Sequence, residues 1–186
     1  MTPRAFVDAY LAAAVANERA SGVPWQVTLA QAALESGWGR HAPGNNFFGI
    51  KADASWAGAR QTLRTREVID GASVSVEADF RAYATPLESF ADHAAFLRRW
   101  PRYAAAFTTR DPREFARLVA AAGYATDPHY AATLVKLIDQ VEALAPGAAS
   151  PPPARLETAK TATTPAIAMR PRPGLLARLA ALFGVR

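Results

Sequence analysis

A chain of 186 residues, with 51% hydrophobic and 20% charged residues, is long enough for one globular domain with a hydrophobic core and short appendages. No apolar run reaches the roughly 18 residues of a membrane-spanning helix, and the absence of cysteine excludes disulfides, thiolate metal sites and a cysteine nucleophile. The net charge of +5 does not indicate nucleic-acid binding, because residues 1–146 hold fifteen basic and fifteen acidic residues and the excess lies in residues 147–186.

The chain begins with two predicted helices. Thr2-Pro3 combines a capping residue with proline at the first helical position, which predicts a helix start. A second helix is predicted from Pro24 to Glu35 or Ser36, because its apolar residues recur at helical spacing and Gly37 follows as a stop.

Residues 60–80 alternate between apolar and polar side chains, with Asp70-Gly71 at the centre, which predicts a two-stranded hairpin with a type I′ turn. This turn places Ile69 opposite Ala72 and Glu67 opposite Val74. Glu67 is then the only charge on the apolar face, where a lone carboxylate is costly unless it is paired or lines a cleft. The alternatives are a register shifted by one residue, or a fraying strand end that lets Glu67 reach water.

Three more helix starts follow the hairpin: Thr85-Pro86, Asp111-Pro112 and Asp127-Pro128. Glu88 and Glu114 lie three residues after the first two caps and complete capping boxes. Apolar residues at helical spacing follow each start. The sequence therefore predicts a mostly helical domain over residues 1–145 with one small hairpin, an α+β fold.

The composition changes after Ala145. Residues 146–173 are rich in Pro, Ala and Thr and predict a disordered or extended linker. Residues 174–186 predict a short basic amphipathic helix, too short to span a bilayer, which could lie on an anionic membrane or lipopolysaccharide surface or dock on a partner. The alternative is a helix folded back on the domain, or a frayed terminus.

The amino terminus carries an acid, Asp8, and an aromatic, Phe6, where a secretory signal needs a basic start and an unbroken apolar stretch. We therefore expect no signal peptide. If the protein works outside the cytoplasm, release or a dedicated export route would have to carry it there.

Glu35 ends the second predicted helix, directly before Ser36-Gly37-Trp38-Gly39. The negative end of the helix dipole and an aromatic neighbour that excludes water both raise the pKa of a carboxyl group. A raised pKa is what a general acid needs at neutral pH. The alternative is an ordinary surface glutamate in the last turn of a helix.

The segment 30–39, Ala-Gln-Ala-Ala-Leu-Glu-Ser-Gly-Trp-Gly, and the segment 45–51, Asn-Asn-Phe-Phe-Gly-Ile-Lys, closely resemble the core motif of glycoside hydrolase family 73. Segments 65–71, 80–83 and 122–130 agree with that family in the same order, so the resemblance covers roughly residues 5–143. The family comprises bacterial and phage endo-β-N-acetylglucosaminidases.

The resemblance implies a lysozyme-like fold, with Glu35 as general acid at the cleft between a helical body and a hairpin lobe. It places the second acidic residue of the family at Glu67, the position that the hairpin register also singles out. It implies that Tyr124 lies near Glu35 and helps to orient the reacting sugar or water. The expected substrate is the glycan strand of peptidoglycan.

The expected substrate-binding residues are Trp38, Asn46, Phe47, Phe48 and Tyr130. Flat aromatic faces match the apolar faces of sugar rings, although core packing is the alternative, above all for one of the two phenylalanines. Asn46 could bind an acetamido group or close its own loop by an Asx turn. The three histidines, which include His93, have no metal-ligand spacing and are interpreted as surface or packing residues. We predict no metal, no cofactor and a monomer.

The leading hypothesis is a peptidoglycan hydrolase that acts as a phage or prophage lysin or in local wall remodelling. A lytic transglycosylase or muramidase of similar fold is one alternative. A transglycosylase needs one acid and no partner that activates water, so Glu67 argues against it. A non-catalytic wall-binding or assembly module is the other alternative, and the presence of both carboxylates disfavours it.

Overall fold

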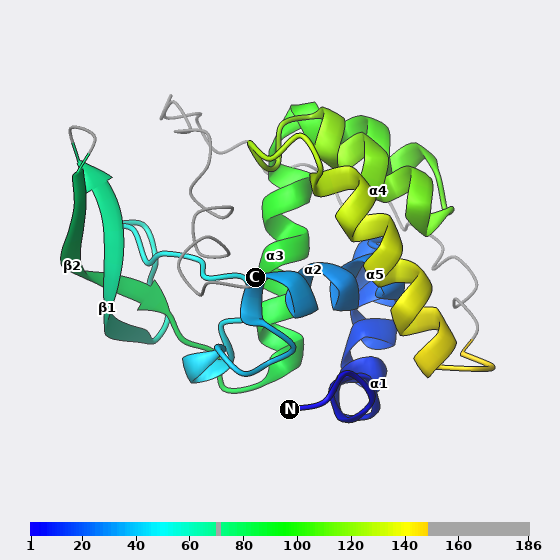
Figure 1. Cartoon of the computed structure of the whole chain (residues 1–186), viewed down its shortest axis with the longest axis horizontal. Coiled ribbons are helices and arrows are strands. Elements are labelled where there is room, and N and C mark those ends of the chain that lie inside the picture. The colour runs from blue at the N-terminus through cyan, green and yellow to red at the C-terminus, as the bar shows by residue number, and fades with distance from the viewer. Residues whose placement is uncertain (70–71, 149–186) are drawn as a thin grey trace.

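The computed structural model describes residues 1–69 and 72–148 of the chain (Figure 1). A hairpin of two strands projects to one side of a body of helices (Figure 1). The elements in chain order are α1 (Pro3–Ser21), α2 (Trp25–Ser36), the 3₁₀ helix η1 (Pro43–Asn45), β1 (Arg60–Ile69), β2 (Ala72–Arg81), α3 (Pro86–Arg99), the 3₁₀ helix η2 (Pro101–Thr108), α4 (Pro112–Ala121) and α5 (Tyr130–Leu144). The predicted mostly helical α+β class is confirmed.

Helix α2 lies in the centre of the helical body and contacts α1, α4 and α5. All of its residues except Leu34 are buried, as expected for a helix surrounded by other elements. Val27 and Ala30 pack into one hydrophobic cluster with α4 and α5, while Leu29 and Ala33 pack into a second cluster with α1. A helix held on every side in this way fixes the direction of any functional side chain that it carries.

Three predicted helix starts are confirmed. The hydroxyl of Thr2 accepts a hydrogen bond from the Ala5 backbone N–H, and the hydroxyl of Thr85 accepts one from Glu88. The carboxylate of Asp111 accepts two, from Arg113 and Glu114. Each cap satisfies backbone donors that the first turn of a helix leaves without partners.

The predicted start at Asp127-Pro128 is wrong by a short distance, because α5 begins only at Tyr130. The carboxylate of Asp127 accepts a hydrogen bond from the His129 backbone N–H, and its carbonyl accepts one from Tyr130. The cap-and-proline pair therefore starts a single turn that leads into the helix.

The predicted hairpin register is confirmed pair for pair. Ile69 faces Ala72, Glu67 faces Val74 and Arg64 faces Glu77 in the antiparallel ladder. Side chains on the predicted polar face, such as Glu77, are exposed, while those on the other face are more buried towards the base, where Phe80 is 3% exposed. The turn at residues 70–71 lies outside the described residues.

The base of the hairpin is fastened to α3 by Arg81 at the end of β2. The guanidinium of Arg81 donates to both carboxylate oxygens of Asp92 at 2.8 Å, and the Tyr83 hydroxyl donates to one of them at 2.7 Å. The guanidinium carbon of Arg81 also lies over the Trp56 ring, 4.3 Å from the ring centre. These partly buried, charge-assisted contacts fix the base of the hairpin relative to the helical body.

Residues 149–186 lie outside the described residues. They include most of the predicted linker at residues 146–173 and all of the predicted amphipathic helix at residues 174–186. Among the residues that the structure does describe, no helix combines the length and the apolar character needed to cross a bilayer.

Candidate active site

Glu35 sits at the C-terminal end of α2, where the chain turns sharply. Gly37 ends the helix with φ of 58° and Trp38 follows with φ of 60°, a left-handed conformation that a residue with a side chain rarely adopts. The Ser36 hydroxyl donates to the Ala32 carbonyl at 2.5 Å and accepts from the Gly39 N–H at 2.8 Å, which fastens the turn. Strained backbone that its surroundings hold in place is common at active sites.

The Glu35 side chain is 7% exposed, and its Oε2 atom is buried without a hydrogen-bond partner. Burial raises the pKa of Glu35 from 4.5 to about 8, because a charged carboxylate is poorly solvated there. The carboxyl group is therefore mostly protonated at neutral pH. Of the two causes that the sequence predicted, the exclusion of water is the one that raises the pKa of Glu35 here.

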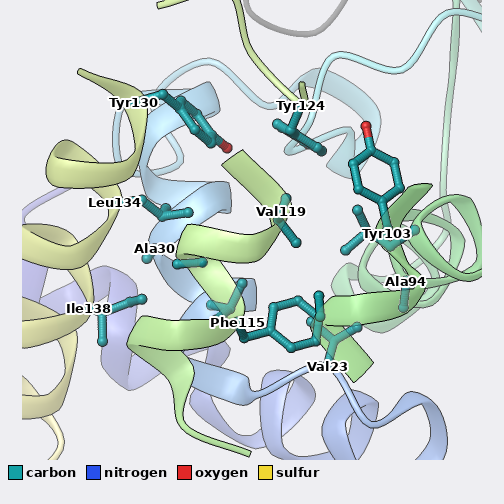
Figure 2. Packing of buried hydrophobic residues seen from close by; sticks show 14 residues of the cluster. Val23, Ala30, Ala94, Tyr103, Phe115, Val119, Tyr124, Tyr130, Leu134 and Ile138 are labelled. Atoms are coloured by element: carbon teal, nitrogen blue, oxygen red, sulfur yellow. The ribbon is translucent and has the colours of Figure 1, made fainter. Parts of the chain in front are cut away.

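Two tyrosines lie near Glu35, one before α5 and one at its start. Tyr124 is 4% exposed and Tyr130 is 5% exposed, and their rings stack with centres 5.5 Å apart. Both lie at one end of the buried cluster, above the aliphatic residues of α5 (Figure 2). Burial raises the pKa of both hydroxyls well above 10.0, and the nearby charge of Glu35 raises them further. The structure thus brings Glu35, Tyr124 and Tyr130 together.

Two polar residues that the sequence did not single out as site residues bind these hydroxyls. Gln31, one turn before Glu35 on α2, donates from Nε2 to the Tyr130 hydroxyl oxygen at 2.9 Å. His93 Nε2 lies 3.0 Å from the Tyr124 hydroxyl oxygen. Helical spacing could have found Gln31, because residues four apart share a helix face. No pattern in the sequence connects His93 on α3 with Tyr124.

Phe47 and Phe48 are 1% and 0% exposed and belong to the core. Phe47 packs against Phe90 with ring centres 5.4 Å apart, and Phe48 stacks on the His93 ring at 3.9 Å. Neither ring has a free face for a sugar, so the packing alternative applies to both and the predicted sugar stacking does not.

Asn46 is 4% exposed, and its amide binds backbone. Its Nδ2 donates to the carbonyls of Ile50 and Arg81, both at 2.9 Å, and its Oδ1 accepts from the Ile50 N–H at 3.0 Å. These bonds close its own loop and tie that loop to the end of β2. Asn46 therefore corresponds to the loop-closing alternative, with an additional link to the hairpin.

Trp38 is partly buried, with the edge of Phe6 packed against its ring at 5.6 Å between centres. Its ring retains exposed surface directly after Glu35, so sugar binding by Trp38 stays a prediction. Glu67 is described only by its backbone register opposite Val74 in the hairpin. Its role stays a prediction as well.

Across residues 1–69 and 72–148, the structure gathers no group of three or more His, Asp or Glu side chains that could hold a metal ion. What it does provide at Glu35 is a buried carboxyl group close enough to Tyr124 and Tyr130 for its charge to raise the pKa of both hydroxyls. Chemically, a carboxyl group that keeps its proton in this setting can deliver that proton to a leaving oxygen.

Comparison with known proteins finds relatives that are similar to this chain in sequence. The peptidoglycan hydrolase FlgJ of Salmonella typhimurium is 45% identical over 141 residues, which are 72% of this chain and 44% of that protein. The exo-glucosaminidase LytG of Bacillus subtilis is 36% identical over 124 residues, which are 62% of this chain and 43% of that protein. The chain thus spans less than half the length of these curated relatives.

A solved structure of a C-terminally truncated glycoside hydrolase domain of Salmonella typhimurium FlgJ superimposes with a TM-score of 0.68 at 41% identity. The match covers 76% of this chain and 99% of that domain, and it confirms the lysozyme-like fold class. A profile described as mannosyl-glycoprotein endo-β-N-acetylglucosaminidase matches residues 11–143. The chain therefore belongs to the glucosaminidase family, glycoside hydrolase family 73, as its motifs predicted.

Proposed function

We propose that this chain hydrolyses the glycan backbone of peptidoglycan as an endo-β-N-acetylglucosaminidase, with Glu35 as the general acid. The proposal rests on the burial of Glu35, which is only 7% exposed. This burial raises the pKa of its carboxyl group to about 8. A carboxyl group that keeps its proton at neutral pH can protonate the oxygen of a departing sugar.

In the proposed reaction, the bond between the anomeric carbon and the glycosidic oxygen breaks while the Glu35 proton moves to that oxygen. Positive charge builds on the sugar ring, and Glu35 is left as a carboxylate. Hydrolysis is completed when the oxygen of a water molecule bonds to the anomeric carbon and a water proton passes to a base. Glu35 is reprotonated before the next turnover.

Glu67 is the proposed second carboxylate. The sequence supports this role because Glu67 is the single charge on the apolar face of the hairpin, and its register position opposite Val74 agrees with that placement. A carboxylate about 6.5 to 9.5 Å from the acid activates water, whereas one about 5 Å away acts as a nucleophile. We favour water activation, or stabilisation of the positive ring, by Glu67.

The relatives support the substrate class, because two of them are a peptidoglycan hydrolase and an exo-glucosaminidase. We also propose that the attack is endo-acting. From the sequence alone, we propose that the protein acts at the wall after release or export, and that residues 174–186 contact an anionic membrane or lipopolysaccharide surface.

Mass spectrometry of peptidoglycan digested by the full chain tests the bond that is cleaved. We expect oligomeric fragments that end in a reducing N-acetylglucosamine, because an endo-acting glucosaminidase cuts after that sugar and adds water. Single N-acetylglucosamine units released from chain ends would point to an exo mode. Anhydromuramic ends, or reducing N-acetylmuramic acid ends, would contradict the proposal and indicate a transglycosylase or a muramidase.

A further inference from the structure

His93 lies in the core between the candidate active site and the loop at residues 47–48. Its side chain is 0% exposed, and Phe48 stacks on it with ring centres 3.9 Å apart and planes inclined by 11°. Its Nε2 atom is 3.0 Å from the Tyr124 hydroxyl oxygen, and its Nδ1 atom is buried without a partner. The stacked phenylalanine thus holds the plane of the imidazole and aims one nitrogen at Tyr124.

The environment of the two nitrogens indicates which one carries the proton. The ring is neutral, because burial lowers the pKa of His93 to about 3, and a neutral imidazole has one N–H. A proton on Nδ1 would leave a buried donor without an acceptor, which proteins avoid more strongly than an unused lone pair. A proton on Nε2 is donated to the Tyr124 oxygen at 3.0 Å. The Nε2–H form is therefore favoured.

This tautomer has a consequence for Tyr124. When the Tyr124 oxygen accepts from His93, its own proton is free for another acceptor. The second tyrosine shows the same arrangement, because the Tyr130 oxygen accepts from Gln31 Nε2 at 2.9 Å. Each of the two hydroxyls thus accepts from the protein interior. Glu35 Oε2 is buried with no hydrogen-bond partner, so a charge formed on it lacks a donor, and Glu35 is close enough for that charge to affect both hydroxyls.

We propose that His93 is a positioning residue for catalysis: by donating its Nε2 proton to the Tyr124 hydroxyl, it makes that hydroxyl a donor to the Glu35 carboxylate formed during proton transfer. No covalent bond of His93 or Tyr124 is made or broken. The contact strengthens as Glu35 becomes charged, so it favours the transition state over the bound substrate. This inference rests on the proposed function of Glu35.

Nitrogen-15 NMR of the full chain, without substrate, tests the tautomer on the wild-type protein. We expect the His93 ring to carry its proton on Nε2 and to show no titration between pH 5 and pH 9. A proton on Nδ1, or protonation of both nitrogens within that range, would overturn the proposal. This measurement needs neither activity nor a variant, so its failure is distinct from a failure of the proposed function.

A double-mutant cycle on soluble glycan fragments of peptidoglycan tests the coupling to catalysis. His93→Phe keeps a flat ring on Phe48 and removes both nitrogens, while Tyr124→Phe removes only the hydroxyl. We expect each change to lower kcat by about 10- to 100-fold with little change in KM, as for loss of a hydrogen bond to a charged group. The double variant should be no slower than the slower single variant.

His93→Gln should recover at least about tenfold of the kcat lost in His93→Phe, because the amide nitrogen of glutamine can donate in place of Nε2. His129→Gln, a change at an exposed histidine, serves as the matched control and should leave kcat unchanged. Multiplying losses in the double variant, or full kcat in His93→Phe, would overturn the proposal. If His93→Phe does not fold, the tautomer measurement decides.

Discussion

Replacing Glu35 with glutamine is expected to lower kcat for peptidoglycan hydrolysis by about 100- to 10,000-fold, the usual contribution of a general acid. Glutamine keeps the shape of the protonated side chain but has no acidic proton to deliver. The measurement is the rate at which reducing ends appear in purified peptidoglycan at pH 6 to 7, with variant and wild type compared at equal concentrations of folded protein.

Glu77→Gln is the matched control, because Glu77 is exposed on the outer face of the hairpin. The same change of charge there should leave kcat within about twofold of the wild type, as for a surface substitution away from the reacting groups. An unaltered rate in Glu35→Gln would contradict the role of Glu35 and would favour a different acid or a non-catalytic wall-binding module.

The same substitution should stabilise the folded protein at neutral pH. Glu35 has an ordinary pKa of 4.5 in the unfolded chain and a pKa of about 8 in the folded chain. Between these values the folded state keeps a proton that the unfolded state releases, so the free energy of unfolding falls as pH rises. Glutamine does not ionise in either state and is free of this loss.

We therefore expect Glu35→Gln to exceed the wild type in unfolding free energy by roughly 3 kcal/mol at pH 7 and by less than about 0.5 kcal/mol at pH 4. Urea unfolding followed by tryptophan fluorescence at the two pH values measures the difference. Glu77→Gln should show no such growth with pH. An equal difference at both pH values would mean that the gain comes from packing and that the Glu35 carboxyl is not strongly perturbed.

These two predictions describe one trade-off. The position that keeps the Glu35 proton available for transfer is also a position where the charged form is poorly solvated, so the free enzyme loses stability there as pH rises. The proposed hydrogen bond from the Tyr124 hydroxyl would offset part of that cost when the carboxylate forms during proton transfer.

Local patterns in the sequence determine the parts of the fold that were predicted correctly. The caps at Thr2, Thr85 and Asp111 act within one helical turn, and the structure shows each of them bonded to its own helix. Alternation together with Asp70-Gly71 predicted the hairpin register, because a slip of one residue would exchange its two faces. At Asp127-Pro128 the same reasoning placed the helix start too early, since that signal also suits an isolated turn.

The site depends on contacts that no local pattern encodes. Phe47 and Phe48 are aromatic residues of the kind that stack on sugar rings. Their burial becomes visible only in the folded structure, where α1 and α3 pack around both rings. His93 shows the same limit, since its partner Tyr124 is 31 residues away and approaches it only through the packed core. Glu35 itself was predicted from its place at the helix end and from the surrounding motif.

The state of the Glu35 proton is the central claim, and carbon-13 NMR of the glutamate side-chain carboxyls measures it most directly. The Glu35 signal is assigned by its absence in the Glu35→Gln variant, and its chemical shift is followed from pH 4 to pH 9 in the free protein. We expect one carboxyl to titrate with a midpoint near 8 and to be the signal that the variant lacks. A Glu35 midpoint near the ordinary value of 4.5 would contradict the claim.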